Sequence, residues 1–377
     1  MNVIRSYLRR EIISAVLFVL VAFLSLFAFF DLIRELQDVG KGGYKIQHAL
    51  GFVALGLPAR IYEVLPIAAL IGTIFALSQM AAHSEFTAMR VAGLGRRKAL
   101  FAVASVGIWF VLATGLVGEV VAPQSERLAQ KLRLAALGGT VGGQFRSGLW
   151  IRDAIKDASG KIERLRFVNV GELLPDTSLR RLKVFEFDPE FRLIGILEAG
   201  SGRFVPPGSW VLSDARQLAL EPVKVAGDTV ALQARPSALE QLTWRSDLTP
   251  DLLGVLMVDP DGMSIWTLSQ YISHLKENLQ RTDRYEIALW KKVTYPLAVF
   301  VMMALALPFA YLQVRAGGIG VRVFSGIMLG VAFHFLNSLF AHLGLLNTWP
   351  PWITAMTPSL VAALLALGLL AWADRVR

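Results

Sequence analysis

Six long, almost uninterrupted apolar runs dominate the chain. They lie at residues 13–33, 49–80, 100–122, 293–312, 323–343 and 353–372. A helix of about 20 apolar residues crosses the hydrocarbon core of a bilayer, and each run reaches that length. The pattern therefore predicts six membrane-spanning helices, three before and three after a long polar stretch.

The stretch between the third and the fourth run has a different pattern. Segments such as I-E-R-L-R-F-V-N-V and L-K-V-F-E-F-D alternate apolar and polar residues, as half-buried strands do. Pro206, Pro207 and Gly208 form a turn signal between two such segments. Many short strands separated by turns indicate an all-β sandwich, a jelly roll or a partly open barrel.

A helical pattern returns after Ser264, where apolar side chains recur every three or four positions at Ile265, Leu268, Ile272 and Leu275. We expect an amphipathic helix that leads back to the membrane. The predicted fold is a polytopic α-helical membrane protein with six transmembrane helices in a 3+3 arrangement. A large all-β, jellyroll-like domain is inserted between the third and the fourth helix. The expected domains are 1–123, 124–263 and 264–377.

Composition supports a membrane protein. Hydrophobic residues make up 54% of the 377 residues, and the mean hydropathy is +0.52, too apolar for one soluble core. The net charge of +9 does not indicate nucleic-acid binding, because many basic residues lie just outside the apolar runs, where they set topology. The chain has no cysteine, which excludes disulfides and thiolate metal sites.

The distribution of basic residues predicts the orientation. An N-terminus in the cytoplasm places four basic groups on the cytoplasmic side: Arg5, Arg9 and Arg10; Arg96, Arg97 and Lys98; Arg315 and Arg322; Arg375 and Arg377. The positive-inside rule favours this arrangement strongly. Both termini are then cytoplasmic, and the β-rich insert lies on the far side of the membrane.

The segment 84–98, S-E-F-T-A-M-R-V-A-G-L-G-R-R-K, joins the second and third runs. Ser84 can cap a short helix over 84–95, which Gly93 and Gly95 end. Phe86 and Met89 share a face at a spacing of three, and Arg90 is one turn from Phe86. A short helix with an apolar and basic face suits docking on a soluble partner. A solvated basic loop that only fixes topology is the alternative.

Recognisable catalytic and nucleotide-binding motifs are absent from the sequence. It contains no G-x-x-x-x-G-K-[ST], no H-E-x-x-H and no G-x-S-x-G, and its five histidines show no ligand spacing. We therefore assign no catalytic residue and no metal site. Apart from Arg60 and Glu63, charges in the apolar runs lie near their ends, which argues against ion-coupled transport.

Basic residues also follow the first and third runs on the non-cytoplasmic side. They are Arg34, Lys41 and Lys45, and then Arg127, Lys131 and Arg133. Positive charge there runs against the topology preference, and Arg and Lys both suit phosphate groups. An anionic lipid headgroup is one interpretation, and solvated helix ends with snorkelling side chains are the other.

Several longer motifs resemble the lipopolysaccharide export permeases, the LptF/LptG family of Gram-negative inner membranes. They include S-E-F-T-A-M-R-V-A-G, G-E-V-V-A-P-Q-S-E-R-L-A, T-W-R-S-D-L-T-P-D-L-L-G-V-L-M-V-D-P-D-G-M-S-I and R-Y-E-I-A-L-W-K-K-V-T-Y-P-L. The resemblance covers nearly the whole chain, and the 243–265 stretch is more similar to the LptG branch than to the LptF branch.

The resemblance implies a permease subunit of an ABC transporter. Such a subunit extracts lipopolysaccharide from the outer leaflet of the inner membrane and passes it to a periplasmic β-jellyroll bridge towards the outer membrane. It implies four protein partners: the paralogous permease, an LptB ATPase dimer, LptC and the periplasmic LptA bridge. The partner ATPase uses ATP and Mg, so no cofactor is expected in this chain.

The resemblance also implies roles for particular residues. The 84–95 helix becomes a cytoplasmic coupling helix that contacts the ATPase through Glu85, Phe86, Met89 and Arg90. Arg133 falls where the family has a basic residue that faces the lipid's phosphates. Together with the basic residues singled out above, the expected lipopolysaccharide headgroup residues are Arg34, Lys41, Arg127, Lys131 and Arg133. Asp31 stands where some members carry a lysine, and Arg34, almost one turn later, is the expected substitute.

Strand alternation adds candidates for the lipid path in the β domain, namely Phe167, Val184, Phe185 and Ile196. Two other functions fit parts of the pattern. One is a mechanotransmitting ABC membrane subunit that works a periplasmic domain without moving lipid through itself. The other is a membrane-anchored enzyme, which is disfavoured because the insert shows no catalytic constellation.

Overall fold

The computed structural model describes most of the chain. The described residues are 2–93, 95–137, 148–156, 162–174, 178–206, 208–224, 230–246, 248–250, 253, 259–278, 280–311 and 318–375. Pro207, Arg315 and Arg377, which the sequence patterns single out, lie outside them.

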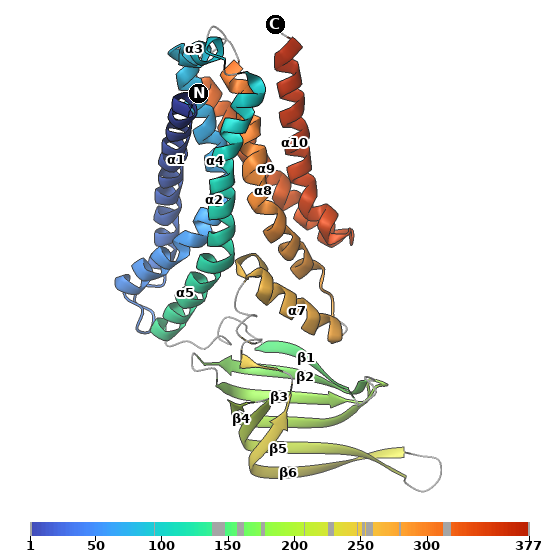
Figure 1. Ribbon diagram of the computed structural model, residues 1–377. Coiled ribbons are helices and arrows are strands. Elements are labelled where there is room, and N and C mark those ends of the chain that lie inside the picture. The colour runs from blue at the N-terminus through green and yellow to red at the C-terminus, as the bar shows by residue number, and fades with distance from the viewer. Residues whose placement is uncertain are drawn as a thin grey trace.

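Six helices in the described residues are long and apolar enough to span a membrane, as predicted. They are α1 (Asn2–Leu36), α2 (Ile46–Ala82), the continuous run of α4 (Arg96–Leu116), η1 (Val117–Val121) and α5 (Ala122–Leu137), α8 (Asp283–Tyr311), α9 (Ile319–Leu346) and α10 (Pro351–Arg375). The η1 segment is a π-helical stretch inside the third span. The short helix α3 (Glu85–Val91), the N-terminus and the C-terminus lie at one end of the bundle, and the β-sheet lies beyond the other end (Figure 1).

Helix α2 is the centre of the bundle. In its most apolar window 83% of the residues are buried, against 22% for α1 and for α9. Gly72 lets α1 approach α2 closely, because a Cβ there would lie 2.5 Å from the Cα of Val16. The exposed sides of α1 and α9 carry large apolar residues such as Phe18 and Phe335, as expected of helices that face lipid or another membrane protein.

The described residues of the insert form one six-stranded antiparallel sheet in which each strand pairs with the next along the chain. The strands are β1 (Leu149–Lys156), β2 (Ile162–Leu173), β3 (Leu179–Phe187), β4 (Leu193–Val205), β5 (Ser209–Lys224) and β6 (Val230–Arg245). The all-β prediction for the insert is confirmed. The sheet starts later than residue 124, because the helix of the third span continues through α5 to Leu137.

One face of the sheet carries a hydrophobic core. Its residues include Val168, Val184, Leu197, Trp210 and Leu212, all 5% exposed or less. The Trp210 indole Nε1 donates a hydrogen bond to the carbonyl oxygen of Leu248 at 2.8 Å, which fixes the chain after β6 against this face.

The predicted amphipathic helix is α7 (Ile265–Glu277), between the sheet and the start of α8 (Figure 1). Its apolar side is buried, and Tyr271 packs edge-on against Tyr285 of α8 with ring centroids 4.7 Å apart. The Ser264 hydroxyl accepts a hydrogen bond from the backbone N–H of Thr267, so α7 begins with a side-chain cap.

The start of α3 differs from the expectation. Ser84 adopts a left-handed conformation (φ 61°), and its side chain makes no capping hydrogen bond. The chain reverses sharply between α2 and α3 at this residue, so the hydroxyl is not placed over the first turn. The backbone still starts the helix, since the Ala88 N–H donates to the Ser84 carbonyl at 3.0 Å.

Candidate functional site

A cavity of about 740 Å³ lies where α1, α2, α5, α8 and α9 meet. It uses the C-terminal part of α1 and the N-terminal part of α8, which are the ends nearer the sheet (Figure 1). Residues 259–262, directly before α7, complete one wall. The cavity thus lies among the helices, at the end of the bundle nearer the β domain.

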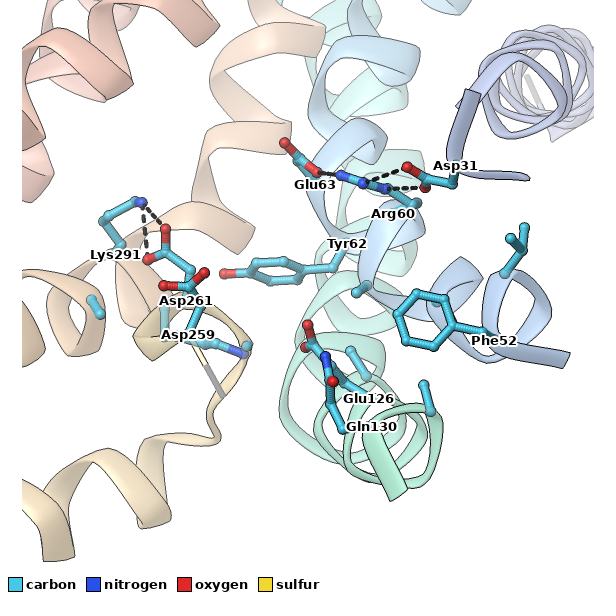
Figure 2. Close-up of a pocket in the computed structure, with 18 of the residues that line it drawn as sticks. Asp31, Phe52, Arg60, Tyr62, Glu63, Glu126, Gln130, Asp259, Asp261 and Lys291 are labelled. Carbon is cyan, nitrogen blue, oxygen red and sulfur yellow. Dashed lines mark hydrogen bonds and ion pairs between the residues drawn. The ribbon is translucent and has the colours of Figure 1, made fainter. Parts of the chain in front are cut away.

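One wall is organised around Arg60 of α2. Its guanidinium forms a two-pronged ion pair with Asp31 of α1, with Nε–Oδ2 at 3.0 Å and Nη2–Oδ1 at 3.1 Å. The remaining Nη1 donates to Glu63, one turn later on the same helix face, at 3.0 Å. Figure 2 shows these three side chains in line along one side of the cavity. The guanidinium is therefore already shared between two carboxylates.

A second polar group joins α5 to the turn between α1 and α2. The Arg133 Nη2 atom donates to Asp38 at 2.6 Å, and its Nε lies 3.5 Å from Glu35. The hydroxyl of Tyr44 donates to Glu35 at 2.7 Å, and Lys41 donates to Asp38 at 2.7 Å. Hydrogen bonds from Lys41 and from Arg133 lower the pKa of the Asp38 carboxyl. Burial, together with the hydrogen bond to Glu35, raises the pKa of Tyr44.

The opposite wall comes from α8 and the segment before α7. Lys291 pairs with Asp261 at 2.9 Å, and Lys292 donates to the carbonyl oxygen of Gly118 at 2.7 Å. The Lys292 ammonium also lies 5.0 Å from the centre of the Tyr62 ring, a cation–π contact. Figure 2 shows the Tyr62 ring between this wall and Arg60.

The cavity is mixed in charge rather than uniformly basic. Its described lining holds five Lys or Arg and six Asp or Glu residues. The cations are Arg34, Arg60, Arg133, Lys291 and Lys292, and the acids are Asp31, Glu35, Glu63, Glu126, Asp259 and Asp261. An incoming phosphate would therefore either displace carboxylates that are already bound to these cations or share the cations with them.

Two of the five predicted headgroup residues line the cavity, Arg34 and Arg133. Lys41 does not line it and is hydrogen-bonded to Asp38, the partner of Arg133. Arg127 points to α7 instead and donates to the Thr267 hydroxyl at 3.0 Å. Lys131 is an exposed side chain that does not line the cavity. The structure thus separates Arg127 and Lys131 from Arg133, because α5 turns these residues to different sides.

Three of the cavity cations, Arg60, Lys291 and Lys292, were not predicted from the sequence as binding residues. Arg60 stood out only as a charge within an apolar run. A signal for the lysines existed, since they form a basic doublet directly before the fourth apolar run, much as Arg133 lies shortly after the third run. The long-range partner of Arg60, Asp31, left no local signal.

The short helix α3 places the four predicted coupling residues on two different sides. Phe86 and Met89 share a face, but that face is buried at 2% and 8% exposure in the core of the bundle. They anchor α3 and cannot form its outer surface. Arg90 is exposed, and Glu85 is partly exposed and accepts a hydrogen bond from the Tyr7 hydroxyl at 3.0 Å.

The four predicted lipid-path residues do not share one face. Phe167 pairs with Phe185, and Phe185 pairs with Ile196, so these three form one row across β2, β3 and β4. Val184 is the neighbour of Phe185 and points to the opposite face, where it is fully buried in the sheet core. The half-buried row is extended by Leu218, which pairs with Ile196.

A family model for the lipopolysaccharide export system permease LptF/LptG matches residues 6–372. The chain belongs to this family. It is 32% identical over 371 residues to the lipopolysaccharide export system permease protein LptG of Escherichia coli (strain K12), covering 98% of each chain. It is 30% identical over 361 residues to LptG of Haemophilus influenzae, covering 96% of each chain.

Membership in the LptF/LptG family agrees with the architecture. The chain is a multi-pass membrane protein with a β domain between its third and fourth spans. The curated relatives are permease proteins, so this chain is a transport subunit.

Proposed function

We propose that this chain takes lipopolysaccharide from the outer leaflet of the inner membrane into the charged cavity and passes it to the β domain, on the way to the outer membrane. The cavity carries this proposal, because its lining comes from five helices at the end of the bundle next to the sheet. Arg34 and Arg133 supply cations for headgroup phosphates, Arg by paired hydrogen bonds.

The acyl chains set a second requirement. Each CH₂ group moved from lipid into water costs about 0.8 kcal/mol, so a lipid with several chains does not leave the bilayer unaided. Its chains must meet apolar surface as they leave. The half-buried row of Phe167, Phe185 and Ile196 offers such a surface, and Trp150 extends it by stacking on Phe185 at 5.9 Å.

The energy would come from a separate ATPase, for which we propose the LptB dimer. Helix α3 lies at the end of the bundle away from the sheet, where Arg90 and Glu85 are accessible (Figure 1). In this proposal both termini and α3 face the cytoplasm and the sheet faces the periplasm. The paralogous permease, LptF, completes the cavity, and LptC and LptA receive the lipid.

Site-specific photocrosslinking tests this function. A photoreactive residue at Val53, which lines the cavity, is compared with one at Trp109, which is 65% exposed on the outside of the bundle. In membranes that contain lipopolysaccharide and phospholipid, we expect lipopolysaccharide adducts enriched at position 53 over position 109. Equal labelling at both positions would favour the alternative function, a mechanotransmitting subunit that moves no lipid through itself.

A further inference from the structure

Helix α7 connects the cavity wall to the sheet, and each of its ends is fixed by a buried or half-buried hydrogen bond to a different part of the molecule. It lies between the membrane helices and the sheet in Figure 1. At 13 residues it is about 20 Å long, given a rise of about 1.5 Å per residue. It is therefore long enough to reach from the membrane helices to the sheet.

The N-terminal end is held by the third span. Both carboxylate oxygens of Glu119 accept the backbone N–H of Ile265, at 3.0 and 2.9 Å. Arg127 of α5 donates to the hydroxyl of Thr267, which is 8% exposed, at 3.0 Å. The N–H groups of a first turn lack partners within the helix, and negative charge is favourable there. Glu119 therefore stabilises the start of α7.

Glu119 belongs to the π-helical segment η1, where the third span departs from regular geometry. The adjacent Gly118 packs against the Tyr62 ring so closely that a Cβ would lie 2.4 Å from it. Its carbonyl accepts the hydrogen bond from Lys292, which is 6% exposed. Single-turn π segments often occur at functional positions in helices. A rearrangement of the cavity wall at η1 would displace Glu119 and the end of α7 bound to it.

The C-terminal end is held by the sheet. Asn278 follows α7 and is 5% exposed. Its Nδ2 donates to the carbonyl of His274 at 2.9 Å, and its Oδ1 accepts the backbone N–H of Ala154 at 2.8 Å. Among the described strands β1 is an edge strand, so Asn278 accepts the Ala154 N–H on the side of β1 that faces away from β2.

Strand β1 is in turn hydrogen-bonded to the segment that follows β6, the last strand of the sheet. Asp153, next to Ala154, is 2% exposed and accepts a hydrogen bond from the hydroxyl of Ser246, directly after β6, at 2.8 Å. Along its length α7 packs on α8 through Leu268, which is fully buried, and Lys276 pairs with Glu286 at 2.8 Å. A displacement of α7 would therefore reach both the first strand and the segment that closes the sheet.

We propose that α7 is a rigid link that positions β1 relative to the cavity wall, with Glu119 and Asn278 as its two positioning residues. The link itself is a property of this chain. The role of this link in transport rests on the proposed function: it keeps β1 in a fixed position relative to the cavity while lipid passes from the cavity to the sheet.

Distance measurements between spin labels test the link without any lipid. The chain has no cysteine, so two introduced cysteines label only the chosen positions. Leu128, on the exposed side of α5, and Ser201, an exposed residue of β4, are suitable. In the full chain Glu119→Ala and Asn278→Ala should each broaden the distance distribution. The distance distribution of the double variant should be no broader than that of either single variant, because both substitutions act through one helix.

A conservative variant separates this role from a general loss of folding. Glu119→Gln keeps an oxygen that can accept the Ile265 N–H, so it should retain the narrow distribution. Asn278→Ala should also speed amide exchange at Ala154 about fivefold, the factor for losing one ordinary hydrogen bond. Exchange at the buried Leu212 of β5 should not change.

A distance distribution that stays narrow in both alanine variants, or broadening that adds up in the double variant, would overturn the link.

Lipid transfer is measured in a separate experiment. With photoreactive residues at Val53 and Phe185, Glu119→Ala should lower the lipopolysaccharide adduct at 185 several-fold and leave that at 53 unchanged. If the distances respond as expected but no lipopolysaccharide reaches position 53 even without these substitutions, the proposed function fails and the link stands.

Discussion

Arg60 and Asp31 join α2 to α1 through two parallel hydrogen bonds, at 3.0 and 3.1 Å, at the wall of the charged cavity. They are 29 positions apart in the chain. Paired contacts of this kind are the strongest form of ion pair, and the Arg60 side chain is only 33% exposed. The pair therefore both closes one side of the cavity and holds a cation within reach of an incoming anion.

Breaking this pair should loosen α1. Asp31→Asn removes the charge that holds Arg60 to α1, and we expect a loss of about 1 kcal/mol in stability, since the pair is partly solvated. Glu63→Gln is the matched control, because it removes the other partner of Arg60 but breaks only a contact within α2. Thermal unfolding in detergent measures both. An equal loss in the two variants would contradict the account.

Arg133 should matter more for lipid capture than its neighbour Lys131. Arg133→Glu places a third carboxylate beside Glu35 and Asp38 and should lower lipopolysaccharide crosslinking in the cavity about tenfold or more, the factor for one charge-assisted hydrogen bond. Lys131→Glu makes the same charge change on an exposed side chain outside the cavity and should have little effect. Comparable losses in both variants would show that only the total charge matters.

The two sides of α3 should respond differently to substitution. Phe86 is 2% exposed, so Phe86→Ala leaves a cavity in the bundle and should cost about 3–5 kcal/mol of stability. Arg90 is exposed, so Arg90→Glu should leave folding intact and reduce co-purification of the partner ATPase. Unfolding curves and affinity purification separate these outcomes. Full ATPase recovery and normal transport in Arg90→Glu would refute a coupling role for α3.

Acid should weaken the contact between α5 and the α1–α2 turn. The pKa of Asp38 is lowered by its hydrogen bonds to Lys41 and Arg133, so the folded state favours the charged carboxylate. That stabilisation is present above the ordinary pKa of an aspartate, about 3.9, and is lost as the pH falls through the lowered folded value. The stability difference between wild type and Asp38→Asn should thus be constant from pH 7 to about pH 5 and shrink below about pH 4. A difference that keeps its full neutral-pH size down to pH 3 would contradict this assignment.

Much of the fold could be predicted because its signals are local. The six apolar runs, the alternation in the insert and the spacing of Ile265, Leu268 and Ile272 each determine one element, and each element is present. Burial within an element was harder to predict. The apolar face of α3 looks like a docking face, but Phe86 and Met89 bury it against the chain's own bundle.

The cavity could be predicted only in part, because its groups meet through tertiary packing. Arg34 and Arg133 followed from their places after apolar runs, whereas the pairing of Arg60 with Asp31 depends on how α1 crosses α2. In the sheet, alternation alone puts Val184 and Phe185 on opposite faces, so the predicted set of four could not have lined one path. Register was needed to find the row of Phe167, Phe185 and Ile196.

The central claim is that this chain hydrolyses no nucleotide and that a separate ATPase drives its lipid from the cavity to the sheet. The most direct measurement places a photoreactive residue at Phe185 in the chain, reconstituted with its partners in vesicles that contain lipopolysaccharide. We predict a lipopolysaccharide adduct at position 185 that rises when ATP is added with the partner ATPase, and no ATP hydrolysis by the chain alone. An adduct that forms equally without ATP, or hydrolysis by the purified chain, would contradict the account.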